Sequence, residues 1–148
     1  MLFSGSSKNY GIRMTTLASL LLRVFAPFAA GYFLSFLFRA VNAVLAPELL
    51  RDLGMGPSAL GLLTATYFIA FASFQVPLGV LLDRYGPRRV EAALLLVAAS
   101  GAFWFARAET ISQLLIGRAL IGLGVSACLM AAFKAYTQWF AAERWPLI

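Results

Sequence analysis

The sequence contains no histidine, which removes both the most common metal ligand and the most common general base in proteins. It contains one cysteine, Cys128, in an apolar stretch, so we expect neither an intrachain disulfide nor a cysteine-based metal cluster. Acidic residues number six, and none stands deep within an apolar run. No nucleophile is paired with a base. We therefore expect no enzymatic activity, no metal and no cofactor.

Charge of either sign is also scarce. Charged residues make up 12% of the chain, hydrophobic residues 61%, and the mean hydropathy is +0.84. The charges gather in short clusters between long uncharged runs, a distribution typical of membrane spans joined by loops. The net charge of +6 does not indicate nucleic-acid binding, because no basic stripe alternates with exposed aromatic residues. We expect the lipid bilayer to be the solvent of this protein.

Four apolar segments are long enough to cross a bilayer core of about 30 Å at about 1.5 Å per residue. We expect them at Phe25–Pro47, Pro57–Leu82, Val90–Ala106 and Ser112–Lys134. The links between them are short and contain glycine or proline breakers in the first two cases, so consecutive helices should be antiparallel neighbours. The predicted fold class is all-α, an integral membrane bundle of four transmembrane helices.

The transmembrane region is expected to cover residues 25–134. We interpret residues 1–24 as a cytoplasmic leader and not as a cleaved signal peptide, because the apolar stretch is too long, contains Arg23 and lacks a small-x-small cleavage site. Residues 135–148 are aromatic and amphipathic, which suits the headgroup region of a membrane. We interpret them as a cytoplasmic tail leading toward an absent fifth span.

Lysine and arginine residues in the links predict the orientation. The leader, the second link and the tail hold seven of them, whereas the first and third links hold only Arg51 and Arg107. By the positive-inside rule, both termini should lie in the cytoplasm, and the protein should be a multi-pass protein of the plasma (inner) membrane.

A distinctive motif stands between the second and third segments. It reads Gly79-Val-Leu-Leu-Asp83-Arg84-Tyr-Gly86-Pro-Arg88-Arg89. Gly79 permits close helix approach, Gly86 allows the turn, and the arginines hold the loop inside. The motif resembles the loop signature of the major facilitator superfamily, Gly-x-x-x-Asp-Arg-x-Gly followed by basic residues. Pro87 departs from the family, which usually has a basic residue at that place.

A second match lies in the fourth segment, where Arg118-Ala-Leu-Ile-Gly122-Leu-Gly124 resembles the family signature Arg-x-x-x-Gly-x-Gly. Gly122 and Ser126 form a small-xxx-small pair that lets another helix approach. Gln75-Val-Pro-Leu-Gly79 and Trp139-Phe-Ala-Ala-Glu-Arg144 are also similar to family sequences. The resemblance extends from about Tyr32 to Arg144 and covers four of the twelve spans that the family usually has.

The resemblance implies a secondary transporter that moves a small solute by alternating access between two bundles. It also implies that Asp83 contacts a helix N-terminus and basic groups of the opposite half, so that the loop acts in gating. Four helices do not make both bundles. We therefore expect either a truncated transporter or a chain that assembles with a second polypeptide or a second copy.

Two arginines within the spans point to the solute. Arg39 and Arg118 stand about 12 Å and about 9 Å from the outer ends of their segments, counted along the helix. Each costs at least about 2.5–3.5 kcal/mol to insert, so each should face a cavity or a partner. No acidic residue lies deep within any span, so an anionic solute, acids on the missing helices, backbone carbonyls or water should compensate them. We hypothesise that the solute is an organic or inorganic anion. Other polar residues on the same helix faces complete the predicted substrate site: Tyr32, Asn42, Tyr67 and Gln75.

Other interpretations of these features remain open. The polar stripes are also consistent with hydrogen bonding between helices. A four-span transporter that works as a dimer, and a membrane scaffold or assembly protein without transport activity, are alternatives to a partial transporter. A proton-coupled dimeric transporter usually needs a carboxylate embedded in the membrane, which the sequence does not place deep in any span.

Overall fold

The computed structural model describes residue 19 and residues 21–139. Most of the predicted leader and the last part of the predicted tail therefore lie outside the described residues. Every secondary-structure element in the described part is a helix, which confirms the all-α fold class. By length and composition, three helical stretches of the described residues can cross a membrane, and a bent pair of helices is a fourth candidate if the two together form one span.

The first span is α2, Ala26–Asp52, which continues from one π-helical turn, η1, Leu21–Phe25. It runs past the predicted end at Pro47, which lies inside the helix and removes only the N–H that would bond the Ala43 carbonyl. Much of α2 faces outward, with Phe33 and Val44 being 62% and 72% exposed. An exposed apolar helix surface of this kind suits contact with lipid or with another membrane helix.

The second span is not the continuous helix predicted over Pro57–Leu82. It consists of α3, Pro57–Ser73, and α4, Gln75–Tyr85, whose axes differ by 45°. Pro77 explains the break, because it has no N–H to donate to the Ser73 carbonyl and its ring crowds that carbonyl. The span is therefore bent where Pro77 lies in the first turn of α4.

The third span, α5, Pro87–Ala106, begins before the predicted start at Val90. Gly86 has a φ of 80°, which glycine adopts readily, and it reverses the chain so that a proline can occupy the first helical position. The fourth span is made of α6, Ile111–Val125, and α7, Ala127–Trp139. These two helices together form one apolar stretch long enough to cross a membrane.

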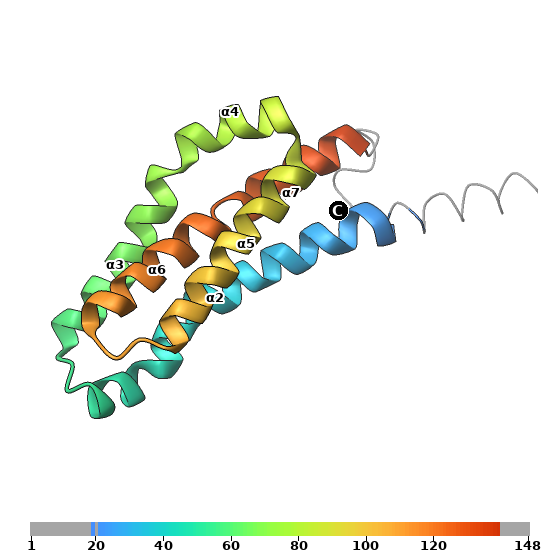
Figure 1. The fold of residues 1–148 in the computed structure, drawn as a ribbon. Coiled ribbons are helices and arrows are strands. Elements are labelled where there is room, and N and C mark those ends of the chain that lie inside the picture. The colour runs from blue at the N-terminus through green and yellow to red at the C-terminus, as the bar shows by residue number, and fades with distance from the viewer. Residues whose placement is uncertain (1–18, 20, 140–148) are drawn as a thin grey trace, which may run out of the picture.

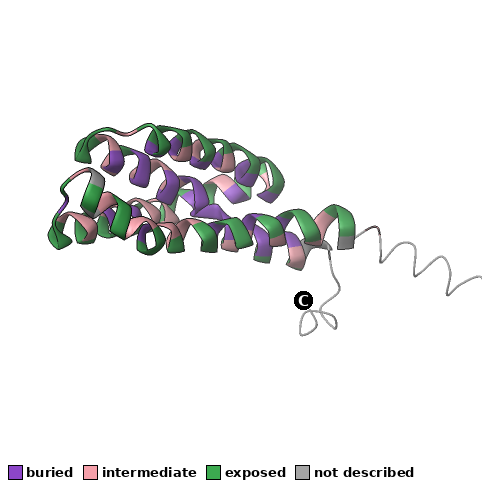
Figure 2. Ribbon diagram, turned by 90° about the horizontal axis from the view of Figure 1, so that it is seen from below, coloured by how far each residue is buried: buried purple, intermediate pink, exposed green. Residues whose placement is uncertain are grey.

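The fourth span forms the centre of the bundle. α6 packs against both α3 and α5, and α7 packs against α5 and α2 (Figure 1). Buried residues account for 61% of the apolar stretch in α6 and α7, against 22% in α2. Figure 2 shows the exposed residues along the outer faces of the helices and the buried ones between them.

Glycines allow the close approach of α6 to its two neighbours. A Cβ atom on Gly122 would collide with the backbone of Tyr67 in α3, and a Cβ atom on Gly124 would collide with the backbone of Ala98 in α5. Ser126 is fully buried at the junction of α6 and α7 and donates a hydrogen bond of 2.6 Å to the Leu123 carbonyl. The residues interpreted as helix packing thus lie at helix contacts.

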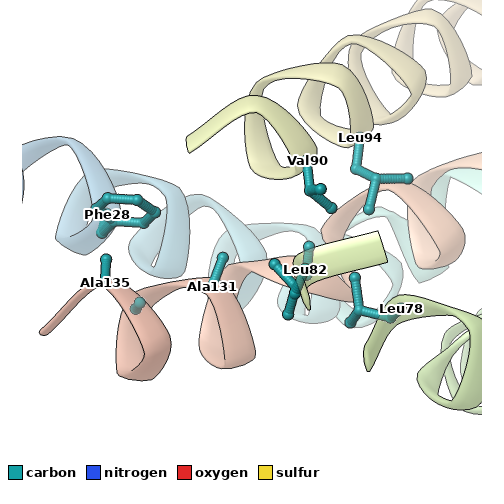
Figure 3. Packing of buried hydrophobic residues seen from close by; sticks show 9 residues of the cluster. Phe28, Leu78, Leu82, Val90, Leu94, Ala131 and Ala135 are labelled. Atoms are coloured by element: carbon teal, nitrogen blue, oxygen red, sulfur yellow. The ribbon is translucent and has the colours of Figure 1, made fainter. Parts of the chain in front are cut away.

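One of two apolar clusters lies at the end of the bundle where α2 begins and α7 ends. We call it the end cluster, and Figure 3 draws its nine buried residues as sticks. It joins α2, α4, α5 and α7 and contains only apolar side chains. Its members are Phe28, Leu78, Leu82, Val90, Leu94, Ala127, Ala131, Ala132 and Ala135.

Candidate functional site

Arg118 lies in the middle of α6 and is 1% exposed. Its Nη1 donates a hydrogen bond of 3.0 Å to the Phe38 carbonyl, and its Nη2 donates one of 2.6 Å to Asn42 Oδ1. The guanidinium carbon lies 4.9 Å from the centroid of the Phe105 ring. A carbonyl, an amide and an aromatic ring thus stabilise this buried charge, and no carboxylate of the described residues pairs with it.

Asn42 of α2 connects three helices. While its Oδ1 accepts from Arg118, its Nδ2 donates a hydrogen bond of 2.8 Å to Thr64 Oγ1 and a longer one of 3.4 Å to the Leu60 carbonyl. The Thr64 hydroxyl in turn donates to the Leu60 carbonyl at 3.1 Å. These bonds link α6, α2 and α3, and the Arg118–Asn42 part of the network is buried, where hydrogen bonds are strong.

Arg39 precedes Asn42 on α2 and lies near two aromatic rings. Its guanidinium carbon is 5.3 Å from the centroid of Phe36 and 5.3 Å from the centroid of Phe71 in α3. Such distances allow cation–π attraction to both rings. The Arg39 Nε is buried and has no hydrogen-bond partner among the described residues. Arg39 therefore keeps donor capacity that the described protein does not use.

Tyr67 of α3 is 2% exposed, and its hydroxyl also has no hydrogen-bond partner among the described residues. The charges of both Arg39 and Arg118 act on this hydroxyl, so the three side chains lie within electrostatic reach of one another. The Arg118 Nε is a third buried donor without a partner in the described chain. Three buried donor groups thus gather between α2, α3 and α6.

The remaining residues of the predicted site make other contacts. Tyr32 is half-buried and packs edge-on against Phe36, with ring centroids 5.1 Å apart. The Gln75 amide donates to the carbonyls of Phe71 at 3.4 Å and Ser126 at 3.5 Å, and so connects the bent second span to the junction of α6 and α7. The structure brings Arg39, Asn42, Tyr67 and Arg118 together, whereas Gln75 is engaged with backbone groups.

The loop motif contains an ion pair between Asp83 of α4 and Lys134 of α7. The Asp83 side chain is 80% exposed and the Lys134 side chain 25% exposed. The aspartate thus bonds a basic group of the fourth span in the same chain. The resemblance had implied contacts of Asp83 with the opposite half of a transporter, and nothing in the described residues represents that half.

The other residues of the motif are mostly exposed. A Cβ atom on Gly79 would meet nothing within 4 Å, so no described helix uses the close approach that this glycine permits. Arg84 lies over the ring of its neighbour Tyr85, at 5.4 Å from the centroid. Arg88 and Arg89 are exposed at the start of α5. The motif therefore presents a basic, solvent-accessible surface beside one ion pair.

Glu91 is a buried ionisable residue that the sequence analysis did not single out. It is 6% exposed, and its Oε1 has no hydrogen-bond partner among the described residues. Its spacing in the sequence could have indicated it, because Glu91 belongs to a row of α5 residues at alternating intervals of four and three, and the structure buries this row. That row consists of Pro87, Glu91, Leu94, Ala98, Gly101 and Phe105.

Comparison with known proteins agrees with the two motifs. The family model of the Major Facilitator Superfamily matches residues 28–148. The nitrate/nitrite transporter NrtP of Picosynechococcus sp. is 31% identical over 110 residues, which cover 74% of this chain and 20% of that protein. The probable sulfoacetate transporter SauU of Cupriavidus necator is 28% identical over 114 residues, which cover 76% of this chain and 26% of that protein.

A third relative is the inner membrane transport protein YajR of Escherichia coli, 33% identical over 86 residues, 57% of this chain and 19% of that protein. The chain thus spans a small part of the length of the curated relatives that it matches. No solved structure matches it significantly. The family model covers most of the chain and the relatives are transporters, so the chain belongs to the major facilitator superfamily.

Proposed function

We propose that this chain forms part of a secondary transporter that carries a small anion across the membrane by alternating access. Membership of the superfamily supports transport, and the relatives differ in the solutes that their names state. Alternating access needs two bundles that move around a common site near the middle of the membrane. The four spans described here would supply one side of that site.

The observation that carries the anion proposal is the group of unpaired donors between α2, α3 and α6. Arg39 Nε, Tyr67 Oη and Arg118 Nε are buried, and none has an acceptor among the described residues. Unpaired buried donors are costly, and two of the three belong to cations. An anion supplies acceptors and negative charge together, which neutral and cationic solutes do not.

The two arginines would have different roles in such a site. Arg118 already donates hydrogen bonds to Phe38 and Asn42. It would therefore hold the helices in place, and its positive charge would attract the anion without direct contact. Arg39 lies near two rings and within electrostatic reach of the Tyr67 hydroxyl, and neither Arg39 Nε nor Tyr67 Oη has an acceptor among the described residues. We assign direct contact with the anion to Arg39 and Tyr67.

Two relatives favour a small oxyanion. The names of NrtP and SauU state nitrate or nitrite and sulfoacetate, all of which are anions with oxygen acceptors. A guanidinium group binds such planar or tetrahedral groups through two parallel hydrogen bonds. Other relatives have names that state multidrug resistance, which is the competing solute class.

The orientation is part of the proposal. The arginines of the loop motif and of the leader would keep both termini in the cytoplasm of a cell whose inner membrane holds the protein. Further helices, from a longer polypeptide, a second copy or a second polypeptide, would close the site opposite α2 and α3.

Binding of nitrate and sulfoacetate to the purified chain in lipid nanodiscs tests the anion site. We expect saturable binding that Arg39→Gln abolishes and that Tyr67→Phe weakens by about 1 kcal/mol, the usual worth of one hydrogen bond. Arg107→Gln is the matched control, because Arg107 lies over the Phe103 ring at the outer end of α5. Binding by Arg39→Gln equal to that of the unaltered chain would disprove the assignment.

Transport is tested separately in membrane vesicles from cells that produce the protein and from cells that lack its gene. We expect accumulation of labelled anion only in the first, with competition by unlabelled anion and none by a cationic drug. Competition by the drug and not by nitrate or sulfoacetate would favour the multidrug class.

A further inference from the structure

Glu91 lies on the buried side of α5, one turn inside the helix. The residues Val90 and Leu94 on either side of it belong to the end cluster, whose members are all apolar. The Glu91 side chain points toward α2, where a Cβ atom built on Gly31 would collide with its Oε1. The Oε1 atom of the carboxyl group is therefore enclosed between α5 and the backbone of α2.

The groups that face Glu91 supply no positive charge. Among the described residues, the ionisable groups within its electrostatic reach are Cys128 and Tyr136 of α7. α2 presents the backbone at Gly31 and the ring of Phe28 in the adjoining cluster. α4 contributes Leu78 and Leu82 to that cluster. All of these groups are neutral in their ordinary protonation states.

The charged residues at this end of the bundle are engaged or directed elsewhere. Lys134 of α7 pairs with Asp83 of α4 near the surface. Arg88 and Arg89 of α5 are exposed. An ionised carboxylate placed among apolar groups without a cation or hydrogen-bond donors loses its hydration and gains nothing in exchange. A protonated carboxyl group avoids that cost.

We propose that Glu91 is a proton-binding site. Its carboxyl group holds a proton while the ends of α2 and α7 are packed against α5, and it releases the proton to water when those ends separate. No covalent bond other than O–H is made or broken, and the solvent takes the proton. The site does not depend on the anion proposal, because none of its residues belongs to the group around Arg39.

Gly31 is the residue that makes the enclosure. Because it has no side chain, the α2 backbone reaches the Glu91 oxygen, and any larger residue would push the carboxyl group away from α2. The space next to Glu91 then admits water, which stabilises the ionised form. Gly31 therefore determines how firmly the proton is held.

Infrared spectroscopy of the full chain in lipid nanodiscs at neutral pH tests the proposal. A protonated carboxyl group gives a carbonyl stretching band that an ionised carboxylate lacks, and isotope-labelled glutamate shifts that band if a glutamate produces it. We expect a labelled-glutamate band in the unaltered chain and in Glu109→Gln, whose carboxylate is exposed, and no such band in Glu91→Gln. A labelled chain without the band would overturn the proposal, and so would a band that persists in Glu91→Gln.

Two further measurements cover the case in which Glu91→Gln does not fold. Gly31→Ala should weaken the band, and the matched substitution Gly61→Ala should not, because a Cβ atom on Gly61 meets nothing within 4 Å. Alkylation of Cys128, the only thiol of the chain, reports opening of the buried interface. We expect the rate of Cys128 alkylation to rise with pH more steeply in the unaltered chain than in Glu91→Gln. If Glu91→Gln does not fold, Glu91→Leu replaces it in this comparison. Equal bands in both glycine variants, or equal pH dependence of alkylation, would contradict the site.

Discussion

Arg118 in α6 donates a hydrogen bond of 2.6 Å to Asn42 in α2, a residue 76 positions earlier in the chain. The same asparagine donates to Thr64 in α3, so one side chain connects the first, second and fourth spans. Polar links of this kind orient helices in a lipid environment, where apolar side chains have no preference for each other over lipid. The bundle around the candidate site therefore depends on this network for its register.

Asn42→Ala tests the importance of that network. The substitution leaves the Arg118 Nη2 group without its acceptor, and we expect the free energy of unfolding to fall by about 1.5–3 kcal/mol, the range for a hydrogen bond to a charged group. Denaturation in mixed lipid–detergent micelles measures it. Thr66→Val is the control, because the Thr66 hydroxyl bonds only the Leu62 carbonyl of its own helix. An effect of Asn42→Ala no larger than that of the control would show that the network adds little.

Gly122→Ala tests the close contact between α6 and α3. The added methyl group would collide with the Tyr67 backbone, which has little freedom to move, so we expect a loss of about 1–3 kcal/mol of stability, as for other overpacked sites. The same denaturation assay measures it. Gly79→Ala should leave stability unchanged or raise it slightly, since nothing lies within 4 Å of its added carbon. Equal effects of the two substitutions would refute the packing role of Gly122.

Pro77→Ala tests the origin of the bend in the second span. An alanine restores the N–H that a proline lacks, so α3 and α4 should approach one continuous helix and the 45° angle between them should decrease. Electron spin resonance distances between labels at Leu62 and Val80, measured in a Cys128→Ala background, report the change. We expect a longer distance in Pro77→Ala. An unchanged distance would mean that packing, and not the proline, maintains the bend.

The spans themselves were predictable, because long apolar runs and charged links are features of composition that do not depend on tertiary contacts. Their boundaries were less so. The start of α5 at Pro87 depends on the positive φ of Gly86, and the bend near Pro77 divides a run that remains apolar throughout. Such breaks are local backbone effects that a count of apolar residues does not register.

The candidate site was predictable in part. The spacing of Arg39 and Asn42 placed both on one face of α2, and Arg118 stood out as a cation in an apolar helix. A backbone carbonyl was among the expected partners of Arg118. Which carbonyl it would be was not foreseeable, because every residue has one and only the packed helices bring that of Phe38 within 3.0 Å. The burial of Glu91 was not predicted, because this residue closely follows a basic loop in the sequence, where a charged side chain is expected at the surface.

The ion pair between Asp83 and Lys134 lies at a different depth from the Arg118 network, and its strength has a different dependence on the surroundings. With an aspartate that is 80% exposed, mobile ions screen the attraction, so added salt weakens it. The Arg118 bonds are closed off from such ions. The ionic strength of the adjoining aqueous phase therefore affects the strength of the ion pair that joins the second and fourth spans near the loop. The hydrogen bonds of Arg118 do not depend on it.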